Sequence, residues 1–173
     1  MSHQLSPEQY SRILELLALE VTEHTDSKDY SDLALFLLDT GYDSLNCRII
    51  AGMQSDYKVE IEPYFRGLLE ETGLADLQYK DDYLIRFLAG TYCRQVLDKE
   101  ILPQEALPKF HSLWLAADFD RLYVRFVEIM DAIELLDEGY SLLEGLGKDN
   151  IDEFIVGTCQ ELLTEIAAMD QRM

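Results

Sequence analysis

Apolar residues recur along most of this chain with the period of an α-helix. Residues 6–21 show the pattern first. Their apolar stripe consists of Tyr10, Ile13, Leu14, Leu17 and Val21. Spacings of three and four residues place these side chains on one helical face. Ser6 and Gln9 fit a capping box and Pro7 fits the first turn, so a helix is expected to begin here.

Seven further segments have the same period and are joined by short connections. They cover residues 30–40, 42–53, 56–73, 81–100, 102–116, 118–139 and 149–170. Gly41 and Gly73 mark expected helix ends, and Asp43 is expected to cap the helix in 42–53. Pro63 is expected either to start the regular part of its helix or to kink it. Pro108 is expected to interrupt the helix in 102–116.

The segment near residues 81–98 is apolar around most of its circumference, which is typical of a central helix. The final helix is expected to be capped by Asp149 or Asn150. Sustained alternation and hairpin turns, the usual signs of strands, are not found in the sequence. The sequence therefore predicts an all-α fold in one domain over residues 1–173. We expect a compact bundle of about seven to eight helices, packed orthogonally around the 81–98 helix.

The charge of the chain is more unusual than its periodicity. Of 173 residues, 34 are acidic and 14 basic, which gives a formal net charge of −20, and 48% are hydrophobic. That apolar content indicates a folded chain rather than a disordered acidic tail. The net charge is −7 over residues 13–47, −3 over 48–125 and −10 over 126–173. Such a surface repels nucleic-acid phosphates and anionic membranes and favours association with basic proteins.

The predicted compartment is the cytoplasm. The first ten residues lack the basic and apolar regions of a signal peptide, and no apolar run approaches the ~20 residues of a membrane helix. Cys47, Cys93 and Cys159 are odd in number and far apart in sequence, which suits a reducing environment. Cys93 and Cys159 lie on apolar stripes, where buried structural thiols are expected rather than nucleophiles.

The segment EHTDSKDYSD, residues 23–32, has a carboxylate at every third position. These residues are Glu23, Asp26, Asp29 and Asp32. Three residues advance a helix by about 300°, so such a series drifts around the helix and does not converge on one point. Asp26 or Asp29 is expected to cap the following helix. Capping with solvation, a partner-binding surface and a metal site are the three interpretations of this segment.

A second group of carboxylates lies on the helix predicted in 118–139. Helical geometry places Asp131, Glu134 and Glu138 opposite the apolar stripe. That stripe contains Leu122, Phe126, Ile129, Ile133 and Leu136. Together with nearby acids these residues form a predicted partner-binding surface, which we call the acidic face. Its members are Glu128, Asp131, Glu134, Asp137, Glu138, Glu144, Asp149, Asp152 and Glu153.

The sequence favours a binding protein over an enzyme, with no cofactor and no metal ion. We expect the acidic face to engage a basic protein, as in a bacterial immunity protein that neutralises a nuclease-like toxin or in a nucleic-acid mimic. Residues 23–32 extend the face if the two ends of the chain lie side by side. One alternative is a metal-dependent all-α hydrolase that uses clustered carboxylates. Its candidate residues are Glu134, Asp137, Glu138, Glu161 and Glu165. The other alternative is a structural or adaptor module whose acidic surface is only solvated.

Overall fold

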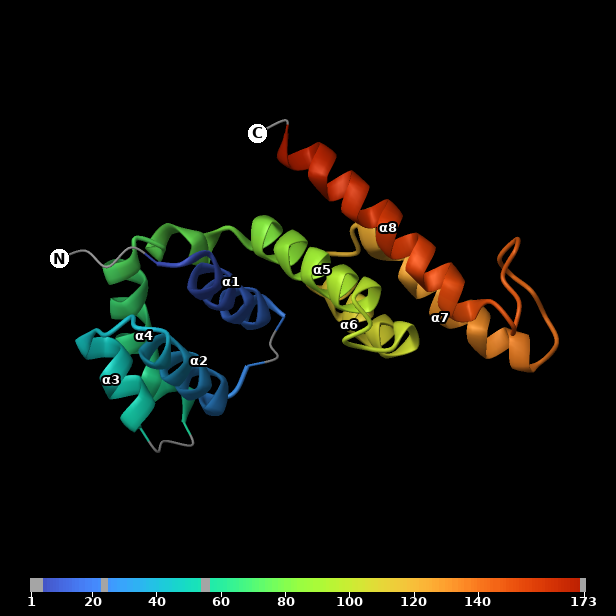
Figure 1. Ribbon diagram of the computed structural model, residues 1–173. Helices are drawn as coiled ribbons and strands as arrows, with labels where there is room; N and C mark the ends of the chain where they lie inside the picture. Colours follow the sequence, from blue (N-terminus) through green and yellow to red (C-terminus); the bar gives the residue numbers. More distant parts are fainter. Residues whose placement is uncertain (1–4, 23–24, 54–56, 172–173) are drawn as a thin grey trace. The chain divides into compact units, whose positions relative to one another are not determined.

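The computed structural model describes residues 5–22, 25–53 and 57–171. All regular secondary structure in these residues is helical, in eight α-helices and one short 3₁₀ helix, which confirms the predicted fold class (Figure 1). The elements are α1 (Pro7–Val21), α2 (Ser27–Asp39), α3 (Leu45–Gly52), α4 (Lys58–Thr72), η1 (Ala75–Tyr79), α5 (Asp81–Leu97), α6 (Pro103–Ala116), α7 (Arg121–Asp137) and α8 (Ile151–Asp170).

The chain divides into two compact units, Met1–Leu84 and Ile85–Met173. The boundary falls inside α5, close to its first turn. Each unit has its own apolar core. The prediction of one domain over residues 1–173 stays a prediction.

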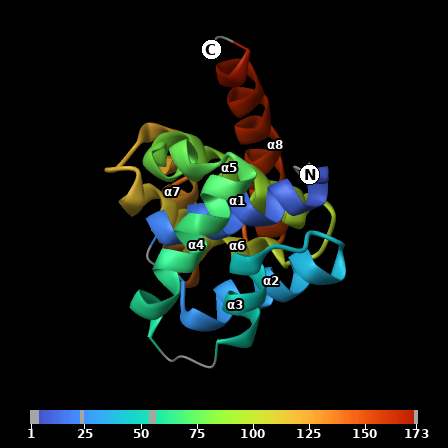
Figure 2. The same ribbon diagram turned by 90° about the vertical axis from the view of Figure 1, so that its left-hand side faces the viewer.

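The first unit is organised around α2, which packs against α1, α3 and α4 (Figure 2). Its core is built from buried aliphatic residues of all four helices and from the aromatic rings of Tyr30, Tyr42 and Phe65. Tyr30 of α2 meets Phe65 of α4 edge to face, with ring centroids 5.0 Å apart. Such aromatic pairs add about 0.5–1.5 kcal/mol beyond the burial of their area. The pair therefore fixes the approach of α2 to α4.

Tyr30 also brings a polar group into this core. Its side chain is 1% exposed, and its hydroxyl donates a hydrogen bond to the Glu20 carboxylate at the end of α1. The ammonium of Lys58 lies 3.7 Å from the same carboxylate and donates to the Thr25 hydroxyl at 2.9 Å. Burial, reinforced by the bond to Glu20, raises the pKa of Tyr30. The network satisfies a buried hydroxyl and ties α1 and α4 to α2.

Helix ends in this unit follow the predicted chemistry closely. Ser6 and Gln9 form the expected capping box, and Gly41 and Gly73 have the positive φ of a helix end. The predicted cap of α3 is wrong by one residue: Ser44 accepts from the Cys47 amide at 3.2 Å. The Asp43 carboxylate instead pairs with the Arg48 guanidinium.

The second unit is held together by a stack of aromatic rings. Phe110 of α6 lies parallel to Phe126 of α7 with centroids 3.7 Å apart. Tyr92 of α5 meets Phe110 edge to face at 6.1 Å. Helix α8 closes the core by packing on α6 and α7, and the buried thiols of Cys93 and Cys159 join it to α5 through a hydrogen bond. Each of the four helices therefore contributes to one core.

The prolines in α4 and α6 do not divide these helices. Pro63 and Pro108 both lie inside a continuous helix, so the predicted interruption at Pro108 is wrong, and Pro63 does not start its helix. A proline removes the N–H that would bond the carbonyl four residues earlier. Those carbonyls belong to the exposed residues Val59 and Gln104. Water can therefore replace the missing bond at low cost.

The Tyr30 network predicts an alkaline limit to stability. Because the pKa of Tyr30 is raised in the folded state, its contribution is present below pH ~10 and is lost as the unfolded chain ionises above that value. We expect Tyr30→Phe to lower the free energy of unfolding at pH 7 by about 1–2 kcal/mol. The deficit should shrink between pH 9 and 11, as measured by urea unfolding at each pH. A deficit that stays constant over this range would contradict the account.

Candidate partner-binding surface

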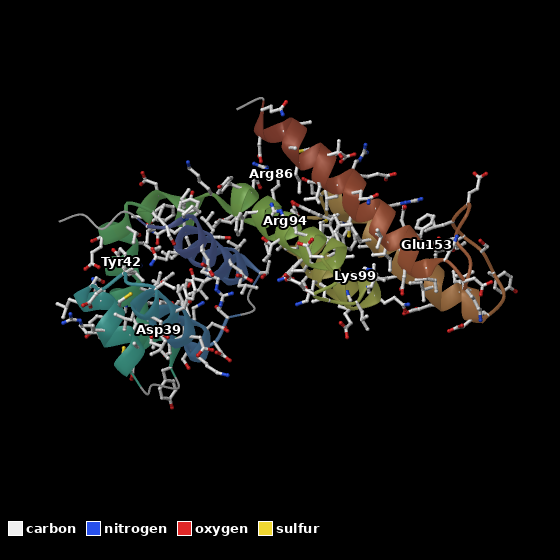
Figure 3. The ribbon with its side chains drawn as sticks, viewed as in Figure 1. Asp39, Tyr42, Arg86, Arg94, Lys99 and Glu153 are labelled. Atoms are coloured by element: carbon white, nitrogen blue, oxygen red, sulfur yellow. The ribbon has the colours of Figure 1, made fainter. Side chains whose placement is uncertain are left out.

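The nine carboxylates of the acidic face are all exposed. Glu128, Asp131, Glu134 and Asp137 lie on α7, and Glu138 ends it. Glu144 and Asp149 lie in the irregular segment 138–150, and Asp152 and Glu153 in the first turn of α8. Figure 3 shows Glu153 near the start of α8, in the region where α7 and α8 lie together. The acidic face therefore covers α7, segment 138–150 and the first turn of α8.

Helix α7 separates its core side from its acidic side as predicted. Its buried residues are Tyr123, Phe126, Ile129 and Ala132. Of the predicted stripe, Phe126 and Ile129 are buried, whereas Leu122, Ile133 and Leu136 are only half-buried. The buried side of α7 therefore includes Tyr123 and Ala132, which the predicted stripe did not contain. Asp131, Glu134 and Glu138 still point away from it.

Most of the acidic face has no neutralising partner. Arg125 pairs with Glu128 at 3.0 Å, and Lys148 pairs with Asp137 at 2.8 Å. For the other seven carboxylates, the described part of the chain places no basic group within 4.0 Å. Like charges one turn apart on a helix cost a few tenths of a kcal/mol per pair. Repulsion between the carboxylates of the acidic face therefore lowers the stability of the folded protein by a small amount.

Segment 138–150 is irregular but well organised by its own hydrogen bonds. Asn150 Oδ1 accepts from the Gly147 amide, and its Nδ2 donates to the Gly145 carbonyl, both at 2.8 Å. Leu146 is buried below this turn. Asn150 occupies the predicted cap position of α8, but its side chain makes no cap bond. It fixes the preceding turn instead, a role that sequence spacing does not reveal.

The first turn of α8 gives two of the acids a structural role as well. Asp152 and Glu153 lie at the positive end of the helix dipole, which stabilises negative charge. Asp152 also accepts a hydrogen bond from the Gln104 side chain at 2.9 Å. These two residues therefore carry less weight as evidence for a partner than the acids of α7.

The EHTDSKDYSD segment has mainly the capping role. Asp26 accepts from the amides of Lys28 and Asp29 and is the N-cap of α2. Asp29 completes the box by accepting from the Asp26 amide at 2.8 Å. Asp32 is exposed, and Glu23 lies outside the described residues. The segment belongs to the first unit, so its role as an extension of the acidic face stays a prediction.

The described residues contain no group of three or more His, Cys, Asp or Glu side chains arranged to hold a metal ion. All three cysteines are buried free thiols, as expected for Cys93 and Cys159. Burial raises the pKa of Cys47 to about 11. The hydrogen bond with Cys159, followed by burial, raises the pKa of Cys93. Both thiols are therefore protonated and poor nucleophiles near neutral pH.

Sequence reasoning missed two features of the surface. Asp118 and Phe119, between α6 and α7, both have positive φ, and the Phe119 ring is 57% exposed while it packs edge-on against Trp114. The second feature is a groove between α1 and α2. The groove depends on contacts between separate helices, which no local pattern shows, whereas the Trp114–Phe119 contact is local to the end of α6.

Comparison with protein-family models, with curated protein sequences and with solved structures gave no significant match. No helix in residues 5–22, 25–53 or 57–171 has the length and apolarity needed to cross a lipid bilayer.

The order of segment 138–150 is predicted to depend on Asn150. Replacing it with Ala removes two side-chain hydrogen bonds, worth about 1–2 kcal/mol together. We expect Asn150→Ala to raise amide hydrogen-exchange rates about tenfold at Leu146 and Gly147, whose amides donate hydrogen bonds within this segment. The amides of α7 should be unchanged, because the core of that helix is not altered. Unchanged exchange at Leu146 and Gly147 would show that Asn150 does not organise this part of the acidic face.

Proposed function

We propose that the protein binds and blocks a basic protein through its acidic face. The partner fits a bacterial nuclease-like toxin, which would make this chain an immunity protein, or a nucleic-acid-binding protein, which would make it a nucleic-acid mimic. The encounter is placed in the cytoplasm, consistent with three buried free thiols. The observation that carries the proposal is the set of seven exposed carboxylates without a basic group within 4.0 Å in the described residues.

The geometry of α7 suits recognition of a basic groove. Acids at spacings of three and four residues place charges ~6 Å apart along the helix, a separation comparable with that of phosphates along a nucleic-acid strand. Phe126 and Ile129 anchor the helix from the opposite side and are 0% exposed. A charge array held on a rigid element loses little conformational entropy on binding.

Charge segregation within the second unit argues against simple solvation. Residues 85–125 contain five acidic and six basic residues, whereas 126–173 contain twelve acidic and two basic residues. A general acidic habit would distribute the excess over the whole unit. Interspersed lysines would also relieve the like-charge repulsion along α7. The clustering is what selection for a basic partner would produce.

The acidic face can be tested by reversing its charge. We expect the triple variant Asp131→Lys, Glu134→Lys and Glu138→Lys to keep its fold, since all three side chains are exposed. It should lose partner binding, because three attractive contacts become repulsive. The measurement is quantitative affinity purification from the host, comparing proteins captured by wild type and by the variant, with circular dichroism as the folding check.

A matched control lies on α8. Glu161, Glu165 and Asp170 are exposed, and their replacement by Lys changes the net charge equally. This control should retain the partner that the α7 variant loses. The proposal fails if the α7 variant captures the same partner as wild type. Equal loss with both variants would indicate unspecific attraction, and a partner retained at high salt would favour the adaptor alternative.

A further inference from the structure

A groove between α1 and α2 lies outside the acidic face, in the first unit. It is open to solvent and has a volume of about 220 Å³. The residues that line it are Arg12, Glu15, Leu16, Leu19, Asp29, Asp32 and Leu33. Three leucines therefore meet three carboxylates and one guanidinium in one concave site. On this side of α2, Asp29 has a structural role in the capping box, whereas Asp32 does not take part in it.

The acids of the groove are not equally engaged. Glu15 is paired with Arg12 at 3.0 Å, and Asp29 accepts the amide of Asp26. Asp32 is exposed, and the described residues provide it with no hydrogen bond or ion pair. Lys28 lies one turn before Asp32 without pairing with it. The groove thus holds one carboxylate that is open to a cation and a second, Asp29, one turn away.

The leucines provide the apolar part of the site. Leu16 and Leu33 are each 4% exposed, so the core holds them in place and each presents only a small edge to the groove. Leu19 is half-buried and provides most of the apolar surface. A ligand that suits this lining has an apolar stem and a cationic end. An arginine side chain has both, and its planar guanidinium can donate to two carboxylates at once.

We propose that this groove receives an arginine side chain of the basic partner. The aliphatic stem lies mainly on Leu19 and touches the exposed edges of Leu16 and Leu33. The guanidinium donates to Asp32 and to the remaining lone pairs of Asp29. That the arginine belongs to a basic partner protein rests on the proposed function. The affinity of the groove for an arginine side chain is independent of the proposed function.

The test uses a capped amino acid in place of the partner. N-acetyl-arginine-N-methylamide is titrated into the full chain labelled with ¹³C at leucine methyl groups, and the matched probe is the uncharged citrulline analogue. We expect saturable shifts at Leu16, Leu19 and Leu33 with a dissociation constant on the order of millimolar, as for a single side chain. The citrulline probe should bind about tenfold more weakly.

Two single variants make the test specific to the groove. Asp32→Asn removes the open carboxylate and should weaken binding of the arginine probe about three- to tenfold. Asp39→Asn removes the same charge from the far end of α2 (Figure 3), outside the groove, and should leave binding unchanged. Asp29 is avoided because it completes the capping box of α2.

The proposal is overturned if the three leucines do not shift, if citrulline binds as well as arginine, or if Asp32→Asn has no effect. These outcomes are independent of the acidic face, since no partner protein is present. A second result would separate the two proposals. If the protein binds the arginine probe but the α7 charge-reversal variant still captures the partner, the groove is supported and the proposed function is contradicted.

Discussion

The structure depends above all on where the chain places carboxylates that repel one another. With 34 acidic and 14 basic residues, most acids cannot find a basic partner. In the first unit several are used to build the fold: Asp26 and Asp29 cap α2, and Glu20 accepts from the buried Tyr30. On α7 and in segment 138–150, most acids have no such use. Charge that costs stability and serves no internal bond is available for binding.

The two surfaces proposed for binding differ in their physical character. The acidic face is broad, with charge spread over a helix, the segment after it and the start of the next helix. Such an array acts mainly on the rate and orientation of encounter. The groove between α1 and α2 is small and combines leucine with carboxylate, so it suits one side chain. Anchoring of single side chains in well-packed pockets usually contributes most of the affinity of an interface.

Sequence alone predicted the helices well because their signals are local. Apolar period, the Ser6–Gln9 box and the glycines at 41 and 73 each act within one turn. The prediction was wrong where two local choices compete, as with Asp43 and Ser44, or where solvent replaces a lost bond, as at Pro108. The exposure of the acidic face was also predictable from the apolar stripe of α7. The bonds of Asn150 and the groove lined by Asp32 and Leu33 were not, because they depend on how separate segments meet.

The central claim is that charge on the acidic face drives association with a basic protein. The most direct test is the association rate constant of the captured partner, measured by stopped-flow fluorescence as salt rises from about 0.01 M to about 0.15 M. Over this range the Debye length falls from ~30 Å to ~8 Å. We predict that the association rate falls at least about tenfold while the dissociation rate changes much less. An association rate independent of salt would contradict the account.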